Sequence, residues 1–138
     1  MKIRKARLKD QKDILDLYYN FNSKEKRKKL LPLKNFKAKL IVLIAEDKKK
    51  SVGFVHASFI DYVFYRYCYI EEFFVEKDFR NKGIGTSLIN NLIKEVKKLK
   101  VNTIFVTTNK KNKNAIELYK KTGFIEDRKH LWFFQNLK

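Results

Sequence analysis

Two glycines at the entrance of an expected helix are the residues of this chain best suited to hold a phosphorylated ligand. Residues 80–85 read Arg-Asn-Lys-Gly-Ile-Gly and stand between an apolar run and a segment of helical periodicity. The first four N–H groups of an α-helix have no partner inside the helix, and Gly83 and Gly85 leave them uncovered. These donors and the positive end of the helix dipole attract anions, and Arg80 and Lys82 add positive charge. The segment therefore predicts a bound phosphate, with a plain strand-to-helix turn as the alternative.

Two well-known phosphate loops do not match this spacing. The nucleotide-binding P-loop requires Gly, four residues and then Gly-Lys-Ser or Gly-Lys-Thr, and the chain has no such sequence. The dinucleotide fingerprint requires three glycines, and none follows Gly85 at the third place. The loop must therefore belong to another class of phosphate site.

Two adjacent acids, Glu71 and Glu72, are the candidates for acid–base chemistry. They lie in the hydrophobic run Tyr-Ile-Glu-Glu-Phe-Phe-Val at residues 69–75. A carboxylate is costly to bury without a partner, so the pair needs a reason. Adjacent strand residues face opposite sides, so we expect only one of the two to point at a given face unless a bulge changes the facing. The structural alternative is that one or both pair with nearby lysines.

A second segment reads as a capped helix that ends at a glycine. Asn112 is suited to the N-cap, and Gly123 stands where a left-handed residue after the helix is wanted. Ala115, Leu118 and Tyr119 share one face by their spacing of three and four. Tyr119 is the candidate proton donor of this segment, and a tyrosine that merely packs on the helix face is the alternative.

These two segments together resemble the N-acetyltransferases of the GNAT superfamily. The acetyl-CoA motif of this superfamily is resembled by the first segment, in which a strand, Arg-x-x-Gly-x-Gly and a helix follow each other. The superfamily's later motif is resembled by the second segment, Asn-x-x-Ala-x-x-Leu-Tyr with a closing Gly-Phe. Both occur in the expected order, and the resemblance spans at least Tyr67 to Phe124. It implies that the loop amides hold the pyrophosphate of acetyl-CoA, the co-substrate, and that pantetheine pairs with the backbone near Phe73 and Val75. The residues that the resemblance assigns to cofactor binding are Phe73, Phe74, Val75, Arg80, Asn81, Lys82, Gly83, Ile84, Gly85, Thr86, Asn112 and Tyr119.

The wording around the two glutamates is similar to that of the polyamine N-acetyltransferases. This likeness implies that Glu71 acts as the base through water and that Glu72 helps to hold a cationic substrate. A base is needed because a primary amine, with a pKa of about 10.4, is mostly ammonium at neutral pH. The thiol of coenzyme A has a pKa of about 8.5, below the phenol value of about 10, so Tyr119 would aid the departure of the thiolate rather than enable it.

The resemblance thus implies an acetyl-CoA-dependent enzyme that moves the acetyl group directly onto a primary amine. A polyamine or another small amine is the favoured acceptor. Protein amino termini, lysine side chains and aminoacyl-tRNA are the rival acceptors. The non-enzymatic alternative is an RNA- or ribosome-binding module that keeps the fold without activity.

Composition agrees with a small enzyme and adds a strong basic charge. The 138 residues suit a single domain over 1–138, and 33 Lys and Arg against 15 acids give a net charge of +18. Such a field attracts polyanions, but the densest cluster, Lys24 to Lys29, is far in sequence from the loop, and no RNA-binding motif accompanies it. The simpler interpretation of this charge is a solvated basic surface, and the more specific interpretation is a surface that binds nucleic acid.

Other chemistry is not supported by the sequence. No apolar run approaches the roughly 20 residues of a membrane span, and no secretory signal opens the chain, so we expect a cytoplasmic protein. His56, His130 and the single cysteine, Cys68, do not form a recognisable zinc site, so no metal is expected. We interpret each histidine as a surface or satisfied core residue and Cys68 as packing. An aromatic band is interpreted as core or as a contact of a homodimer, with an acceptor pocket as the alternative: Phe59, Tyr62, Phe64, Tyr65 and Tyr67.

These residues must be positioned by an α/β fold. The resemblance implies the GNAT fold, in which a mixed, mostly antiparallel sheet of six to seven strands splays between its fourth and fifth strands and about four helices flank it. The expected strands are Lys2–Leu8, Leu40–Ala45, Val52–Ile60, Tyr67–Val75, Thr103–Thr108 and a last strand or hairpin through Ile125–Gln135. The expected helices are one capped by Asp10, an irregular or short helical stretch at Ser23–Lys39, Ile84–Leu99 and Asn112–Gly123.

Overall fold

The computed structural model describes residues 1–21, 39–61, 66–129 and 135. The chain divides into two compact units, residues 1–107 and 108–138, and each is described by itself. The first unit holds the sheet and two helices, and the second holds one helix.

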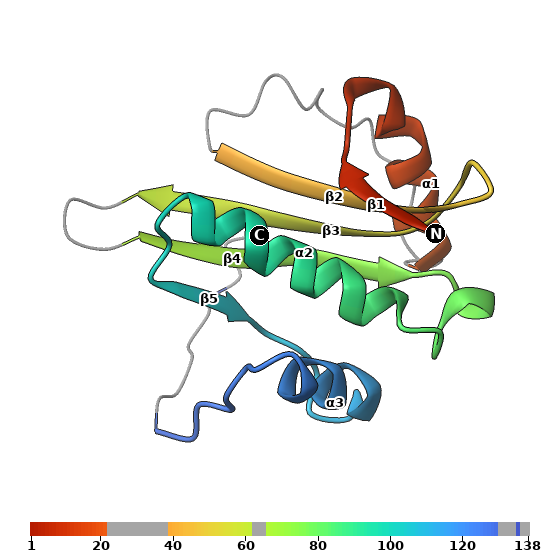
Figure 1. Cartoon of the computed structure of the whole chain (residues 1–138). Helices are drawn as coiled ribbons and strands as arrows, with labels where there is room; N and C mark the ends of the chain where they lie inside the picture. Colours follow the sequence, from red (N-terminus) through yellow and green to blue (C-terminus); the bar gives the residue numbers. More distant parts are fainter. Residues whose placement is uncertain (22–38, 62–65, 130–134, 136–138) are drawn as a thin grey trace. The chain divides into compact units, whose positions relative to one another are not determined.

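The first unit is built on one mixed sheet whose strands follow each other in chain order (Figure 1). The first three neighbouring pairs are antiparallel, and the last pair is parallel. The strands are β1 (Lys2–Lys5), β2 (Lys39–Asp47), β3 (Lys50–Asp61), β4 (Arg66–Val75) and β5 (Thr103–Val106).

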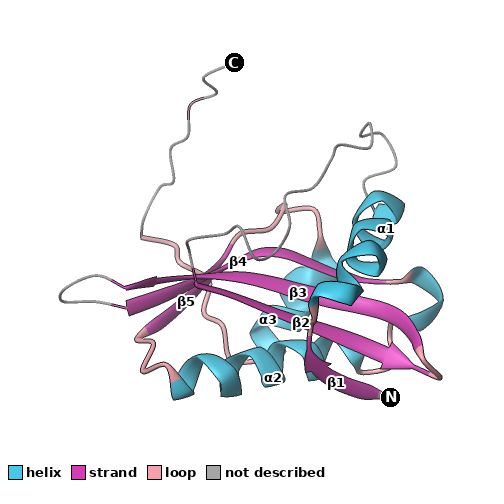
Figure 2. Cartoon of the chain, turned by 90° about the horizontal axis from the view of Figure 1, so that it is seen from above, coloured by secondary structure: helices cyan, strands magenta, loops and turns pink. Residues whose placement is uncertain are grey.

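Two helices cover opposite faces of this sheet, as Figure 2 shows. Helix α1 (Gln11–Phe21) packs on β3 and β4, where Leu17 joins the rings of Phe54 and Phe74 in one buried cluster. Helix α2 (Ile84–Lys98) packs on β2, β3 and β4. Its buried residues recur at helical spacing, as an amphipathic helix requires: Ile84, Leu88, Ile89, Leu92 and Val96.

The core excludes polar groups almost entirely. Cys68 in β4 is 0% exposed, so the interpretation of this residue as packing is confirmed. Gly53 in β3 is required by close approach, because a Cβ there would lie 2.8 Å from the carbonyl oxygen of Phe74. Among the described residues, Asp10 is the one charged side chain that is buried.

The parallel pair is short, and its end separates the two halves of β4. Strand β5 pairs with Tyr67–Ile70 and ends at Val106, level with Ile70. The second half of β4, residues 71–75, continues past the end of β5. In Figure 1, strand β5 turns away from this half of β4. This is the splay between the fourth and fifth strands that the resemblance implied.

The sheet is smaller than the sequence led us to expect. In the described part of the chain there are five strands and three α-helices, where we expected six to seven strands and about four helices. Residues 125–129 are not a strand: Ile125 is 94% exposed, and Asp127 accepts a hydrogen bond from the N–H of Lys129. Such local side-chain bonds compete with a sheet ladder.

Several expectations lie outside the described residues. They are the stretch 23–38, the basic cluster Lys24 to Lys29, the aromatic residues Tyr62, Phe64 and Tyr65, and the segment 130–134 of the expected last strand with its histidine, His130. Of the remaining aromatic band, Phe59 is a core residue, 5% exposed.

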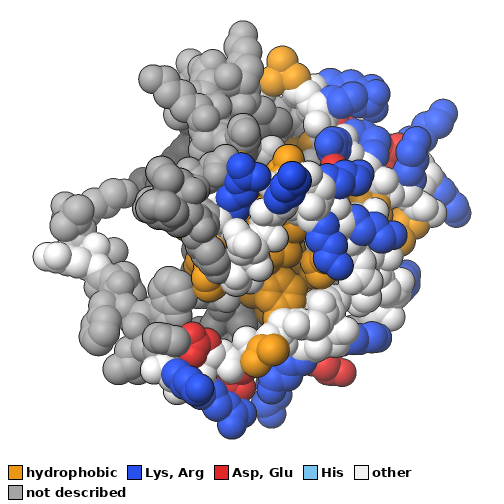
Figure 3. All heavy atoms as spheres, turned by 60° about the vertical axis from the view of Figure 1, so that its left-hand side comes forward, with side chains coloured by type: hydrophobic (Ala, Val, Ile, Leu, Met, Phe, Trp, Pro, Cys, Tyr) orange, Lys and Arg blue, Asp and Glu red, His pale blue; other side chains and the backbone are white. Residues whose placement is uncertain are grey.

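Basic side chains are spread widely over the surface. On the face in Figure 3, Lys and Arg side chains are numerous and acids are few. Helix α2 contributes Lys94, Lys97 and Lys98, all exposed, and Lys98 bonds Glu95 at 2.6 Å. The two lysines in its last turn also suit the negative end of the helix dipole.

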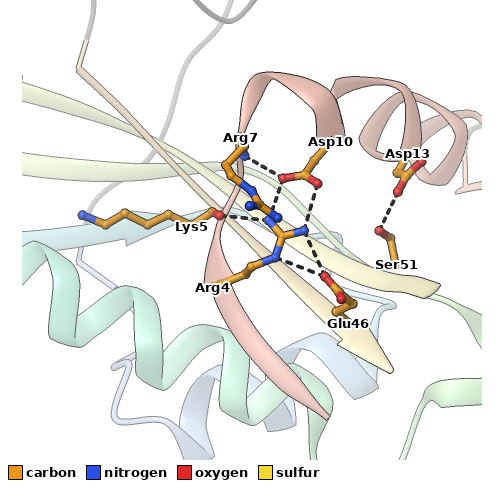
Figure 4. A network of polar contacts seen from close by, with 7 residues as sticks. All are labelled: Arg4, Lys5, Arg7, Asp10, Asp13, Glu46 and Ser51. Atoms are coloured by element: carbon orange, nitrogen blue, oxygen red, sulfur yellow. Dashed lines mark hydrogen bonds and ion pairs between the residues drawn. The ribbon is translucent and has the colours of Figure 1, made fainter. Parts of the chain in front are cut away.

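One ion-pair network ties the first strand to its neighbours (Figure 4). The guanidinium of Arg4 in β1 donates to both oxygens of Asp10, at 2.6 and 2.8 Å, and to Glu46 in β2. Asp10 directly precedes α1, and it also accepts from the N–H of Arg7. The network holds the pKa of Asp10 at about 2, because the hydrogen bond from Arg4 outweighs the cost of burial.

Candidate active site

The glycine loop connects the end of β4 to the start of α2. A short 3-10 turn at Lys77–Phe79 follows β4, and α2 begins at Ile84, as the sequence predicted. Asn81 and Gly83 both have left-handed backbones, with φ of 59° and 76°. Gly83 is the N-cap residue of α2, in a conformation that glycine adopts without the strain of a side chain.

The entrance of α2 presents its backbone donors without a side-chain cap from any described residue. The N–H of Ser87 makes the first helical bond, to the carbonyl of Gly83 at 2.9 Å. The N–H groups of residues 84–86 precede it and have no acceptor within the helix. A Cβ on Gly83 would meet no atom within 4 Å, so the space above this residue is open. The geometry suits an anion bound to main-chain amides.

The two basic side chains of the loop lie against aromatic rings. Nε of Arg80 donates to the carbonyl of Val75 at 2.9 Å, and its guanidinium lies 5.7 Å from the ring centre of Phe74. Nζ of Lys82 lies 5.3 Å from the ring centre of Phe79. Arg80 therefore braces the loop against the end of β4, and its charge remains beside the loop.

A β-bulge lies in β4 at the position of the two glutamates. The antiparallel register of β3 and β4 shifts by one residue, so that Ala57 lies opposite Ile70 while His56 lies opposite Glu72. Glu71 is the extra residue between them. Bulges of this kind re-aim side chains and are frequent beside active sites.

The bulge brings both carboxylates to one face of the sheet. Directly opposed residues share a face, so Glu72 lies on the face of His56. Ser58, two residues further along β3, shares that face, and its Oγ donates to Oε1 of Glu71 at 2.7 Å. The exception that we left open, a bulge that changes the facing, therefore applies here, because the extra residue resets the alternation and both acids lie on one face.

His56 is a further candidate site residue, which the sequence did not reveal. It is half-buried, and its Nε2 is buried without a hydrogen-bond partner among the described residues. Burial lowers the pKa of its imidazole, although the negative charge of Glu71 opposes the shift. The interpretation as a surface or satisfied core residue is therefore wrong. The only signal in the sequence was a histidine inside an apolar strand. Which residues lie beside it could be identified only once the register of β3 and β4 was known.

Tyr69 adds a hydroxyl to the same face. It lies opposite Ser58, and its Oη is 2.8 Å from Oγ1 of Thr107, just past the end of β5. The hydroxyls of Ser58 and Tyr69 thus accompany the glutamates where β4 and β5 part.

The second unit contains the other two predicted site residues. Helix α3 (Lys113–Lys121) begins at Asn112, whose Oδ1 accepts from the N–H of Ala115 at 3.2 Å. Gly123 has a φ of 92°, and the N–H of Phe124 closes the helix end on the carbonyl of Tyr119. Both capping predictions are confirmed.

Tyr119 is buried, 9% exposed, and its ring centre lies 5.5 Å from that of Phe124. Burial raises the pKa of its phenol to about 12. The hydroxyl therefore stays protonated at neutral pH, as a hydrogen-bond donor must. The loop and the glutamates belong to the first unit and Tyr119 to the second.

Metal binding and membrane spanning each require a recognisable structural feature. In the described ranges, no group of three or more His, Cys, Asp or Glu side chains is arranged to hold a metal ion. No helix within the same ranges has the length and apolar character needed to cross a membrane.

Comparison with known proteins gives a family match over most of the chain. The model of the acetyltransferase (GNAT) family matches residues 8–124. An N-acetyltransferase of Methanocaldococcus jannaschii is 47% identical over 57 residues, which are 41% of this chain and 25% of that protein. N-alpha-acetyltransferase 30 of Xenopus laevis is 31% identical over 72 residues, 52% of this chain and 26% of that protein. The matched parts thus span about a quarter of the length of these curated relatives.

Solved structures share the fold over nearly the whole chain. An aminoglycoside acetyltransferase from a soil metagenomic sample, solved with sisomicin, has a TM-score of 0.86 at 18% identity, covering 99% of this chain and 96% of that one. Aminoglycoside N-acetyltransferase AAC(6')-Iy, solved with CoA, has a TM-score of 0.78 at 19% identity, covering 98% and 99%. The ribosomal-protein-alanine N-acetyltransferase of Brucella melitensis has a TM-score of 0.79 at 18% identity, covering 99% and 97%.

Proposed function

The chain belongs to the acetyltransferase (GNAT) family, and from this premise we propose that it transfers the acetyl group of acetyl-CoA directly onto a primary amine. The transferase would be a single domain over residues 1–138. The observation that carries the proposal is the uncapped entrance of α2 at Gly83, which one short turn joins to the strand that bears Glu71 and Glu72.

In this proposal, the cofactor binds along the end of β4 and over the loop. The amides of residues 83–86 hold the pyrophosphate, and Lys82 adds charge beside it. The pantetheine arm runs along residues 73–75 of β4, in the region beyond the end of β5. The early end of β5 at Val106 supports this assignment, because it leaves a stretch of β4 that no longer runs beside that strand.

The acceptor amine meets the glutamates. An ammonium must lose a proton before it can attack the thioester, and Glu71 is the proposed base, acting through water. Glu72, which is half-buried on the same face, holds the cationic acceptor. Over one turnover the ammonium and acetyl-CoA give an amide, free coenzyme A and one proton.

Tyr119 acts on the leaving group as a hydrogen-bond donor. A phenol with a pKa of about 12 is a much weaker acid than a thiol of pKa about 8.5, so complete proton transfer to the thiolate would be uphill by roughly 5 kcal/mol. A hydrogen bond to the sulfur avoids that cost and still stabilises the developing charge. The burial of Tyr119 thus favours a supporting role.

The favoured acceptor is a small molecule that carries more than one amine. Two carboxylates on one face attract a polycation, and polyamines and aminoglycosides both have that character. A solved neighbour in complex with sisomicin supports the choice. A protein amino terminus is the second candidate, favoured by the likeness to N-alpha-acetyltransferase 30.

Release of free thiol from acetyl-CoA, measured across a panel of amines, tests the proposal. We expect turnover with polyamines and aminoglycosides, and none in a Glu71→Gln variant. Turnover confined to peptides with a free amino terminus would replace the small amine by the second candidate. Absence of thiol release with every amine, together with RNA binding that weakens steeply with salt, would instead support the non-enzymatic module.

A further inference from the structure

In the proposed reaction, one proton remains on a glutamate and needs a path to solvent. Two protons leave the nitrogen of the ammonium in each turnover. One ends on the sulfur of coenzyme A, and the other must reach solvent before the next acceptor binds. A glutamate that has taken this proton is no longer a base until it has passed the proton on.

His56 is placed to receive that proton. It lies opposite Glu72, one register position from the bulged Glu71, and opposed Cβ atoms in a sheet are about 4.5–5.5 Å apart. Its Nε2 is buried and has no hydrogen-bond partner within the described part of the chain. Buried polar atoms of this kind are rare and call for an explanation. A neutral imidazole with its hydrogen on Nδ1 offers Nε2 as a proton acceptor.

The other groups around His56 do not compete for this role. Its partner on β2 is Val42, and its neighbours on the same face of β3 are Phe54 and Ser58. Helix α1, which packs on this face, carries the acids Asp13 and Asp16, and Asp13 bonds Ser51 at 2.8 Å. Among the described side chains, Glu71 is the charged group that acts on the pKa of His56, and burial keeps that pKa below its ordinary value, so the ring is neutral at neutral pH.

We infer that His56 returns the proton released by the acceptor amine from the glutamate pair to solvent. This inference rests on the proposed function. The N–H bond of the ammonium breaks as an O–H bond forms on a glutamate, directly or through water. That O–H bond then breaks as an N–H bond forms at Nε2, and the imidazolium loses its Nδ1 proton to water. The resulting Nε2–H tautomer returns to the Nδ1–H form by proton exchange before the next turnover. His56 thus acts through Glu71 and Glu72 as a positioning residue and does not contact the acceptor.

The test compares His56→Gln and His56→Ala with Val42→Ala. Glutamine keeps a hydrogen-bonding side chain but carries no proton between sites. Val42→Ala loosens packing at the same point of the sheet and serves as the structural control. For His56→Gln we expect kcat to fall at least tenfold and the KM for acetyl-CoA to stay within twofold. We also expect the loss of kcat at low pH that protonation of His56 causes in the wild type to be absent from this variant. In His56→Ala, added imidazole should restore turnover in a saturable manner.

The outcomes separate this inference from its premise. Wild-type protein that releases no thiol with any amine overturns both the proposed function and the role of His56. Active wild-type protein with a His56→Gln variant within twofold of its kcat overturns only the role of His56. An equal loss in Val42→Ala, without rescue of His56→Ala by imidazole, also overturns it, because packing then explains the loss. Rescue by imidazole, with an unchanged pH profile in Val42→Ala, supports it.

Discussion

At the scale of single residues, the main chain of Gly83 carries more of the proposed function than any side chain. Its left-handed backbone turns the chain into α2, and the open space beside it admits a ligand to the amides. A side chain at this position would cost backbone strain and would also occupy that space. These two effects can be separated, because Gly123 has the same handedness and equal freedom around its Cα.

Gly83→Val is expected to abolish the binding of acetyl-CoA. A β-branched residue is strained at a φ of 76°, and it fills the space through which a phosphate approaches the amides. Calorimetric titration with acetyl-CoA measures the effect. Gly123→Ala is the matched control: it should lower the free energy of unfolding by about 1–2 kcal/mol through strain alone and leave the affinity unchanged. Undiminished binding by Gly83→Val would remove the loop from the site.

Tyr119→Phe is expected to lower kcat by roughly 10- to 100-fold while the affinity for acetyl-CoA stays nearly the same. The substitution removes a hydrogen bond to a charged sulfur, of a kind worth roughly 1.5–3 kcal/mol, but keeps the ring that packs on Phe124. Steady-state kinetics and thermal melting together measure the effect. A kcat equal to that of the wild type would mean that Tyr119 only packs.

At the scale of secondary-structure elements, the sequence predicted what depends on local patterns. The helix at Ile84 and the cap at Asn112 followed from periodicity and from glycine placement, and both are confirmed. The bulge at Glu71 was not predictable, because it exists only relative to the partner strand β3. For the same reason the sequence did not show that Glu71 and Glu72 share one face or that His56 lies opposite Glu72. We predicted a last strand or hairpin through Ile125–Gln135; its described part at 125–129 is not a strand, Ile125 is exposed, and Asp127 bonds the main chain locally.

The network of Arg4 makes the fold depend on pH through one buried acid. The pKa of Asp10 is depressed to about 2 in the folded chain, against an unfolded value near 3.8. The stabilisation is therefore fully present above about pH 4 and is lost as the pH falls towards 2. It amounts to roughly 2 kcal/mol at neutral pH.

Asp10→Asn should remove this dependence. We expect the free energy of unfolding to drop at pH 7 and to converge with that of the wild type near pH 2. Denaturant titrations at a series of pH values measure the difference. Asp13→Asn is the control, since the exposed Asp13 keeps an oxygen for Ser51 after substitution. A gap between Asp10→Asn and wild type that stays constant with pH would contradict the assignment.

At the scale of the whole molecule, the net charge of +18 would act in opposite directions on acetyl-CoA and on the polycationic acceptor proposed above. Basic side chains such as those on the face in Figure 3 attract the phosphates of acetyl-CoA, and they would repel the proposed polycationic acceptor until it reaches the glutamates. Added salt screens both effects, because the Debye length falls from about 10 Å at 0.1 M to about 3 Å at 1 M.

Raising the salt concentration is therefore expected to increase the KM for acetyl-CoA and to decrease the KM for a polyamine. The control is a mono-amine of similar length, and its KM should decrease less. Initial rates between 0.05 and 0.5 M salt, roughly one decade, measure both constants. If both values of KM rise together, the long-range field does not distinguish the substrates.

The burial of Cys68 allows opening of the folded chain to be measured through the reactivity of its own thiol. This is the single cysteine of the chain, it is 0% exposed, and burial raises the pKa of its thiol to about 11. A disulfide dye that counts liberated coenzyme A will therefore leave the folded enzyme unmodified, since the reactive species is the thiolate. In the absence of substrate, the slow rate at which the dye reacts with Cys68 therefore measures how often the central sheet opens. No engineered label is needed for this measurement.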